Sequence, residues 1–406
     1  MKNNDKAILR ELAEKYMEKA NDPIQEERRK IWRHLNSLQM IRPAIYIRAF
    51  AWREMPQSQC FCNDPFLRGI EDKLRTEIFR SSFGDDYIIE PWLTMKAASN
   101  CSGWGITGTR NFTEEQEVMG AYKEDYPIKE LSDIKKLKVP SHSINEEETA
   151  QKFETLGSMV GDIIKIKVDR GPVYLNFAGD ISTELGHLRG IENIMMDMMD
   201  NPGWLHELLS FMRDGILKVH EEAEKAGDWG LVNHYNQAMP YSLELEDPEP
   251  STQNVARKKL WCFMASQEYT CISPEMFNEF LLQYQIPIIE KFGLSAYGCC
   301  EDLTAKIPFL KKIPNLRRIA LTPFMNIERS VESIGRDYVI SYRPSPADMV
   351  SYDFDRDRIM GILKKGLSLC KGSQFDITLK DVETVERDPE RIRKWVAIVR
   401  EALDEL

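Results

Sequence analysis

The chain has 406 residues with a formal net charge of −11, and 42% of its residues are hydrophobic and 29% charged. This composition is typical of a globular protein with a sizeable core. The negative charge argues against nucleic acid as the main partner, because binding to phosphates needs clustered Lys and Arg side chains.

The beginning of the chain lacks the apolar stretch of a signal peptide, and no run of about 18 apolar residues occurs in it. The eight cysteines are spread along the whole chain. Without a sign of secretion, such cysteines are expected to be reduced thiols, some of which can do chemistry. We therefore expect a cytoplasmic protein that does not span a membrane.

The first part of the chain predicts helices and then two strands. Residues 1–40 are polar and helical, and we expect them to form an N-terminal helical extension. Strands are expected to begin near residues 44 and 88, the second of them leading into Glu90 and Trp92. The apolar positions of the first helix are Ile8, Leu9, Leu12 and Tyr16, at helical spacing.

From residue 170 onward, short apolar runs alternate with amphipathic helices. A strand is expected over residues 173–177. A helix follows with Asn201 as its cap and Pro202 in its first position, and Gly227 ends it. We treat the segment around His234 as an insertion, and further strands are expected to begin near residues 264, 294, 317, 338 and 375.

Alternating strands and helices predict a parallel sheet with right-handed crossovers. Eight strands favour a closed barrel over an open sheet. A glycine-rich phosphate loop would favour the open sheet, but the sequence does not contain one. The sequence therefore predicts an α/β protein, with a (β/α)8 TIM barrel over residues 41–406 behind the helical extension of residues 1–40.

Polar side chains recur just after the predicted strands, where a barrel of this kind carries its active site. Any one of them can be an ordinary loop residue, but their recurrence at strand ends indicates a site. They are Arg48, Trp52 and Arg53 after the first strand, Glu90 and Trp92 after the second, Asn176 and Asp180 after the third, Gln267 and Glu268 after the fourth, Cys299, Cys300 and Glu301 after the fifth, Arg343 after the seventh, and Lys380, Asp381 and Glu383 after the eighth.

The sharpest local feature is the adjacent pair Cys299-Cys300 behind Gly298. Adjacent side chains point to opposite sides of an extended strand, so both thiols can bind one ion only where the chain bends. Two interpretations stay open: a metal site with thiolate and carboxylate ligands, and a buried cysteine pair that only packs. His234 is open in the same way, as a ligand or acid–base group or as a hydrogen-bonded structural residue. The acidic run over residues 243–250 predicts a solvated loop or a lid over the barrel mouth.

Several short motifs occur in the order typical of one superfamily and together cover roughly residues 40–400. With them the chain resembles the uroporphyrinogen decarboxylase-like superfamily, which includes corrinoid-linked methyltransferases. The motifs are Leu188–Glu192, Asp200–Trp204, Ile272–Phe277, Phe292–Leu294, Gly298–Glu301, Leu379–Val382 and Asp388–Arg391.

The resemblance implies a (β/α)8 barrel with its site at the carboxyl ends of the strands. One branch decarboxylates porphyrinogens without a cofactor, and the other moves methyl groups between a corrinoid protein and an acceptor, with zinc holding an acceptor thiolate. That zinc branch places a His-x-Cys pair after the fifth strand and a further Cys after the eighth. Here Tyr297 replaces the histidine, Lys380 and Asp381 occupy the later position, and Cys299 is the residue that matches directly.

The resemblance thus implies a methyltransferase that moves a methyl group from a small O-, N- or S-methylated substrate to or from a corrinoid protein. The alternatives are a cofactor-free decarboxylase of a polycarboxylate such as a uroporphyrinogen, and a carrier or assembly protein without catalytic activity. A homodimer would fit the resemblance. The expected catalytic residues are Glu301, Lys380 and Asp381; the expected zinc ligands are Cys299, Cys300 and His234; and the expected substrate-binding residues are Arg48, Trp52, Arg53, Trp92, Asn176, Tyr235, Gln267 and Arg343.

Overall fold

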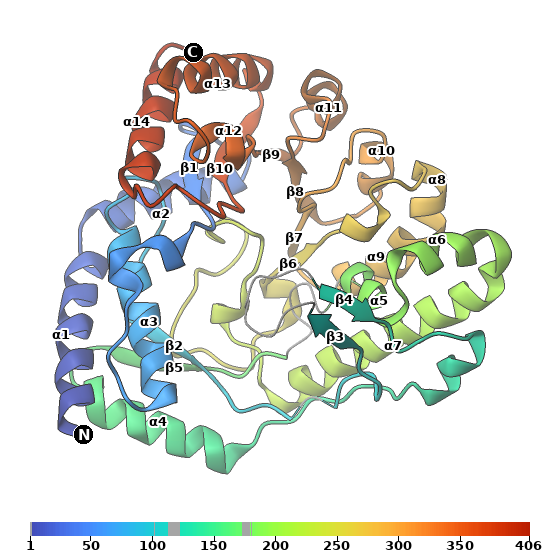
Figure 1. The fold of residues 1–406 in the computed structure, drawn as a ribbon, viewed down its shortest axis with the longest axis horizontal. Helices are drawn as coiled ribbons and strands as arrows, with labels where there is room; N and C mark the ends of the chain where they lie inside the picture. Colours follow the sequence, from blue (N-terminus) through green and yellow to red (C-terminus); the bar gives the residue numbers. More distant parts are fainter. Residues whose placement is uncertain (1, 101, 113–121, 173–178, 180) are drawn as a thin grey trace.

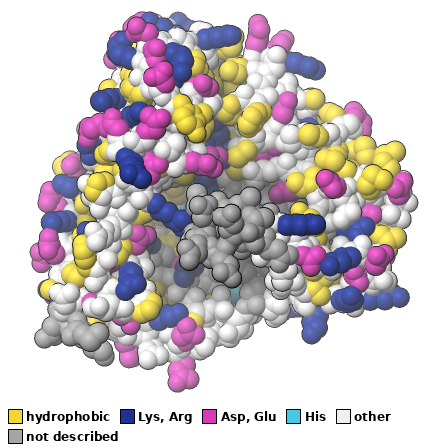
Figure 2. Space-filling model, viewed as in Figure 1, with side chains coloured by type: hydrophobic (Ala, Val, Ile, Leu, Met, Phe, Trp, Pro, Cys, Tyr) yellow, Lys and Arg dark blue, Asp and Glu magenta, His cyan; other side chains and the backbone are white. Residues whose placement is uncertain are grey.

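The structure is a computed structural model that describes residues 2–100, 102–112, 122–172, 179 and 181–406. Across these ranges, none of the helices is both long enough and apolar enough to cross a membrane. On the face shown in Figure 2, Lys and Arg side chains are interspersed with Asp and Glu side chains. The predicted strand over residues 173–177 lies outside the described residues, and so do Asn176 and Asp180.

The centre of the fold is a six-stranded parallel sheet with the order β1-β10-β9-β8-β7-β6. The sheet curls into a half-barrel, and helices lie on the outside of its arc (Figure 1). Its strands are β1 (Ala44–Ile47), β6 (Trp261–Met264), β7 (Leu294–Tyr297), β8 (Leu316–Leu321), β9 (Val339–Tyr342) and β10 (Gln374–Leu379). The six strands expected near residues 44, 264, 294, 317, 338 and 375 are thereby confirmed.

A second parallel sheet consists of β2 (Trp92–Lys96) and β5 (Lys165–Asp169). The described strands thus include eight parallel ones, six in one sheet and two in the other, but neither β2 nor β5 pairs with an edge of the six-stranded sheet. The closed eight-stranded barrel therefore stays a prediction, whereas the α/β half-barrel is observed. An antiparallel hairpin of β3 (Thr109–Phe112) and β4 (Tyr122–Asp125) completes the described sheets.

The expected strand at Ile88 and Ile89 was wrong, because β2 begins only at Trp92. Both isoleucines are buried, which explains the apolar signal in the sequence. Their backbone N–H groups bond to side chains, Ile88 to the Met239 sulfur and Ile89 to the Gln25 amide oxygen, so they do not enter a strand ladder.

The helices include an N-terminal pair and a set that follows the strands. In the first helix Leu9, Leu12 and Tyr16 are buried, as the helical spacing predicts. Gly227 ends α7 with a φ of 74°, also as predicted, although the Asn201 side chain at the start of α7 makes no capping bond. The helices are α1 (Lys2–Ala20), α2 (Ile24–Asn36), α3 (Pro65–Arg80), α4 (Glu146–Val160), α5 (Ser182–Arg189), α6 (Ile191–Asp200), α7 (Pro202–Ala226), α8 (Pro274–Phe277), α9 (Gln283–Ile289), α10 (Ile307–Leu310), α11 (Ile327–Ile334), α12 (Pro346–Met349), α13 (Arg356–Cys370) and α14 (Glu390–Asp404).

Successive side chains in each strand of the half-barrel point alternately to the outer face of the sheet, against the helices, and to its inner face. In β10, Phe375, Ile377 and Leu379 belong to the main hydrophobic core with the outer helices. Asp376 and Thr378 point to the opposite, inner face, and Lys380 continues that alternation beyond the strand. The same alternation places Arg48 after β1 and Arg343 after β9 on the inner face.

Helix α2 and the segment over residues 236–241 pack against the inner face of the sheet. Trp32 of α2 packs edge-on against Tyr46 of β1, and Tyr241 and Val339 belong to the same buried cluster. Beside them, Arg318 of β8 forms an ion pair with Asp376 of β10, whose side chains are 2% and 0% exposed. Both side chains are buried away from water, so each charge is stabilised by the opposite charge of its partner.

We expect Asp376→Ala to lower the free energy of unfolding by about 3–5 kcal/mol, because it leaves the Arg318 guanidinium buried without its counter-charge. The matched control is Glu401→Ala, which breaks an ion pair with Arg356. The side chains of Glu401 and Arg356 are 47% and 53% exposed. That variant should lose less than about 1 kcal/mol. Urea unfolding followed by circular dichroism measures both, and equal losses would contradict the assignment of the buried pair as a structural link.

Candidate functional site

A turn directly after β7 presents the two adjacent cysteines. Gly298 has a φ of 101°, and a Cβ there would lie 2.6 Å from Leu303 and 2.9 Å from Ala320. Only glycine therefore fits this position without displacing its neighbours. The bend that the sequence required is present, and the Cys299 and Cys300 sulfurs lie 3.6 Å apart.

Lys380, the residue after β10, lies between the two thiols. Its ammonium nitrogen is 3.0 Å from the Cys299 sulfur and 3.1 Å from the Cys300 sulfur. It also forms an ion pair of 2.9 Å with Asp381, and its own side chain is only 5% exposed. A buried ammonium needs negative partners, and here these are a sulfur and a half-exposed carboxylate.

The two thiols have opposite acidities. A hydrogen bond from Cys300 lowers the pKa of the Cys299 thiol to about 6, and the positive charges of Lys380 and Arg343 add to this effect against burial. Donating that bond, together with burial, raises the pKa of Cys300. At neutral pH the pair is therefore a thiolate at Cys299 beside a thiol at Cys300.

The same contacts keep Lys380 charged. Burial and the neighbouring Arg343 oppose the protonated form, but the charges of Cys299 and Asp381 outweigh them and raise the pKa of Lys380. The site therefore holds an ammonium–thiolate pair at neutral pH.

The side chains of Glu301 and Arg343 hold the cysteine turn through hydrogen bonds to its backbone. Glu301 is 2% exposed, and its carboxylate accepts hydrogen bonds from the backbone N–H of Ser266 and of Cys299 at 2.7 and 2.8 Å. Arg343 donates to the carbonyl oxygens of Gly298 and Cys299 at 3.1 and 2.7 Å, and burial lowers the pKa of Arg343. Both residues therefore act on the backbone of the turn, and Glu301 is placed as a positioning residue for Cys299.

A pocket of about 230 Å³ opens in front of the cysteine pair. Its other walls come from the loops after β8 and β9, and the Phe324 ring there is 73% exposed. The pocket thus combines a charged floor with an apolar rim. It is lined by Cys299, Cys300, Arg343, Lys380, Asp381, Pro323, Phe324, Pro344, Ser345 and Pro346.

Gln237 is a contact that sequence reasoning missed, because it lies in the segment that we set aside as an insertion. It is 3% exposed, has a φ of 60°, and its amide nitrogen donates to the Cys299 sulfur at 3.7 Å. Within the described ranges, its buried amide oxygen has no hydrogen-bond partner. Tyr235 from the same segment accepts a 2.9 Å hydrogen bond from Arg48. No pattern in the sequence identifies either contact.

Other expected substrate-binding residues are not among those that line the pocket of the cysteine pair. Trp52 and Arg53 occupy a short 3-10 helix after β1, where the Trp52 indole donates to Asp72 at 2.8 Å. Gln267 begins a similar short helix after β6. Trp92 is the first residue of β2, so it lies at the amino end of its strand and not at the carboxyl end, because β2 begins later than expected.

His234 does not join the cysteine pair. Its ring nitrogen accepts a 3.3 Å hydrogen bond from the N–H of Trp261, the first residue of β6. That residue is in register with Leu294, which is roughly 10 Å along β7 from the strand's carboxyl end. Burial lowers the pKa of His234 to about 4, so its ring is neutral.

The described residues contain no group of three or more His, Cys, Asp or Glu side chains that could hold a metal ion. The Lys380 ammonium occupies the space between the Cys299 and Cys300 sulfurs, where a shared cation would bind. Because His234 lies elsewhere, the expected zinc ligands do not come together as a set. The residues of this site therefore fit an ammonium–thiolate pair and do not fit zinc.

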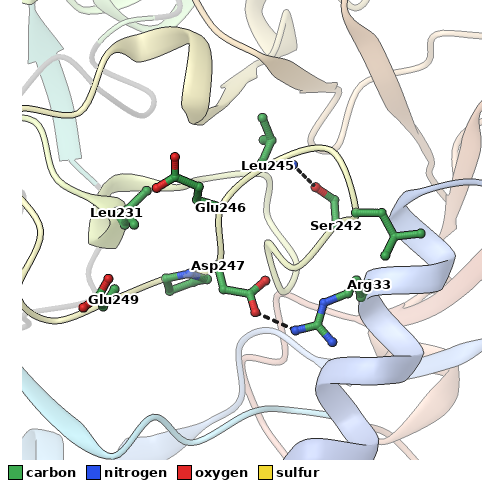
Figure 3. A pocket seen from close by; sticks show the side chains of 9 residues that line it. Arg33, Leu231, Ser242, Leu245, Glu246, Asp247 and Glu249 are labelled. Atoms are coloured by element: carbon green, nitrogen blue, oxygen red, sulfur yellow. Dashed lines mark hydrogen bonds and ion pairs between the residues drawn. The ribbon is translucent and has the colours of Figure 1, made fainter.

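The acidic segment over residues 243–250 lines a larger cavity, of about 530 Å³ (Figure 3). Asp247 forms a 2.5 Å ion pair with Arg33 of α2. Glu244 pairs with Arg317, the second residue of β8, so the segment lies at the amino ends of the strands. It is therefore not a lid over the cysteine pocket.

Neither a family model nor a curated protein sequence matches this chain. Among solved structures, a methyltransferase from Methanosarcina mazei is similar in fold. The similarity covers 93% of this chain and 97% of that chain, with a TM-score of 0.49 and 10% sequence identity. Values this low assign neither a family nor an activity.

The ammonium–thiolate pair can be tested by alkylation. The alkylation rate of Cys299 with iodoacetamide should reach half of its maximum near pH 6, because half of the Cys299 population is then thiolate. Lys380→Met removes the positive charge that favours the thiolate, so the alkylation rate of Cys299 at neutral pH should fall roughly tenfold. Peptide mass spectrometry across a pH series measures the rate.

Lys380→Arg keeps the charge and should keep most of the reactivity, and Lys365→Met removes an exposed lysine and should change nothing. An unchanged pH profile in Lys380→Met would show that Lys380 does not control the thiol.

Proposed function

We propose that this chain is an enzyme that moves a methyl group between a small O-, N- or S-methylated substrate and a corrinoid protein. The observation that carries the proposal is the buried Lys380 ammonium in the wall of a small pocket with an apolar rim. The order of the strand-end motifs, which resembles that of corrinoid-linked methyltransferases, supports the identity of the partner.

The chemistry of methyl transfer requires a stabilised leaving group. When a methyl–oxygen bond breaks, both of its electrons stay on the oxygen, which becomes negative. The Lys380 ammonium lines the pocket, and because its pKa is raised it stays charged and attracts that oxygen. The leaving oxygen can then take a proton from water. A corrinoid on the partner protein would supply the nucleophile for the new bond to the methyl carbon.

The pocket limits the substrate to a small molecule. A cavity of about 230 Å³ is below the size of drug-binding pockets, which begin at about 300 Å³. Phe324 and the neighbouring prolines offer an apolar wall for a methyl group and a carbon skeleton, and Lys380 and Asp381 offer polar contacts at the other side. A methoxyaromatic compound or a methylamine matches this division.

In this proposal Cys299 is a positioning residue for Lys380. Its thiolate is 3.0 Å from the ammonium, so it holds Lys380 charged and oriented toward the pocket. Asp381 adds a second negative partner at 2.9 Å, and its side chain is half exposed to solvent. Zinc, which the resemblance implies, has no role in these steps, because His234 lies apart from the two cysteines and Lys380 contacts both of their sulfurs.

The proposal is tested by mixing the protein with cob(I)alamin and a panel of methoxyaromatics and methylamines, and by following methylcobalamin formation by absorbance. We expect turnover with at least one donor. Lys380→Met should lower the rate by about two orders of magnitude, the usual effect of removing one preorganised transition-state contact.

Lys365→Met is the control variant, since this lysine is exposed and distant in sequence from the pocket loops, and it should keep the full rate. No methylcobalamin from any donor, with correctly folded protein, would count against methyl transfer. An equal rate in Lys380→Met would remove Lys380 from the mechanism.

A second candidate is decarboxylation of a polycarboxylate. Arg48, Arg343 and Lys380 all follow strands of the half-barrel on its inner face, and such cations can hold carboxylates. However, Arg343 is bonded to two backbone carbonyl oxygens, which leaves Arg48 and Lys380 as the cations that could hold a carboxylate. Carbon dioxide release from a porphyrinogen would favour this candidate.

A further inference from the structure

The sulfurs of Cys299 and Cys300 lie close to each other and can be reached from solvent through the pocket. The two sulfurs are 3.6 Å apart, and both line the pocket that opens to solvent. We propose that this pair is a reversible oxidation site, at which a small peroxide converts the two thiols into a disulfide between adjacent residues. The proposal concerns the thiols alone and holds whether or not the chain transfers methyl groups.

The geometry assigns distinct roles to the two thiols. Lys380 contacts both sulfurs, and Gln237 adds a further hydrogen bond to the Cys299 sulfur. These donors stabilise negative charge on Cys299, in agreement with its lowered pKa, whereas Cys300 keeps its proton. Cys299 is therefore the attacking sulfur and Cys300 the resolving one, because only a thiolate reacts readily with peroxide.

The reaction balances with hydrogen peroxide as the oxidant. The Cys299 thiolate attacks one peroxide oxygen, the O–O bond breaks, and hydroxide leaves, so that Cys299 becomes a sulfenic acid. The Cys300 sulfur then attacks the Cys299 sulfur, the S–O bond breaks, and water forms from the leaving hydroxyl group and the thiol proton. The two cysteines lose two electrons in total, and the peroxide gains them.

The product should be easy to reduce. Adjacent Cα atoms are about 3.8 Å apart across a trans peptide bond, which is below the usual separation of disulfide-linked residues. A disulfide under such strain is a labile one that a dithiol can reopen.

Oxidation would also change the charge of the site. The disulfide carries no negative charge, so Lys380 would lose the thiolate that holds it and keep only Asp381, which is half exposed. The modification would thereby switch off any chemistry that depends on the ammonium–thiolate pair.

The chain offers an internal comparison in Cys60 and Cys62, two further thiols close in sequence. Burial raises the pKa of Cys62 to about 12, and the Glu71 carboxylate adds to this effect. Burial also raises the pKa of Cys60, beside Glu71 and Asp72. Carboxylates surround this pair instead of an ammonium, so we expect it to resist peroxide.

The experiment uses the full-length reduced protein, treated with a small excess of hydrogen peroxide and then with iodoacetamide, and analysed by peptide mass spectrometry. We expect the peptide that contains Cys299 and Cys300 to lose two hydrogens and to escape alkylation. Dithiothreitol should restore both thiols. The Cys60–Cys62 peptide should be alkylated normally in the same sample.

Two variants separate the roles of the two sulfurs. Cys300→Ser removes the resolving thiol, so Cys299 should gain one oxygen and become trappable by dimedone. Cys299→Ser removes the attacking thiolate, so Cys300 should stay reduced. The proposal is overturned if the wild-type protein gains oxygen at Cys299 without forming the disulfide, or if the Cys60–Cys62 pair oxidises first. Because no methyl donor is present, failure here is distinguishable from failure of methyl transfer.

Discussion

The burial of one ammonium group is the constraint on which the rest of the site depends. Lys380 is 5% exposed, and a buried cation is stable only with partners that replace its lost hydration. Asp381 is half exposed and supplies part of this compensation, so a second negative group is needed beside it. The Cys299 thiolate is that group. It exists at neutral pH only because Cys300, Lys380 and Arg343 together outweigh the cost of its own burial. The ammonium and the thiolate therefore stabilise each other, and neither is expected in this position alone.

The pair in turn depends on the shape of one turn. The thiolate reaches Lys380 because the chain bends at Gly298, where a side chain would collide with Leu303 and Ala320. Glu301 and Arg343 hold the bent backbone through its N–H and carbonyl groups. Both are charged residues at strand ends, and the sequence assigned Glu301 to catalysis and Arg343 to substrate binding for that reason. In the structure both side chains bond to the backbone of the turn, and Arg343 also lines the pocket. This shows why residue type and strand position alone do not separate a chemical role from a supporting one.

The parts of the site that sequence reasoning located follow from the regular geometry of the sheet. Parallel strands end at one edge, and the alternation within β9 and β10 sets Arg343 and Lys380 on the same inner face. The sequence therefore placed Cys299, Cys300, Lys380 and Arg343 near one another, and the structure brings them together. Errors arose where irregular backbone decides the position. Trp92 lies at the wrong end because β2 starts later than its apolar signal, and His234 and Gln237 lie on a non-repetitive segment that only the tertiary fold places. Gln237 even has a left-handed backbone conformation, which no local pattern predicted.

The same charge pair links the proposed group transfer and the proposed oxidation. Holding Lys380 charged inside the fold requires a thiolate, and a thiolate with a second thiol 3.6 Å away can oxidise to a disulfide. If the partner of Lys380 were a carboxylate, the site would keep the ammonium without this sensitivity. The choice of sulfur therefore makes the charge of the site depend on the redox state of its surroundings. Oxidation of the two thiols would remove the thiolate that holds Lys380, so the proposed oxidation would act on the same ammonium that the proposed methyl transfer uses.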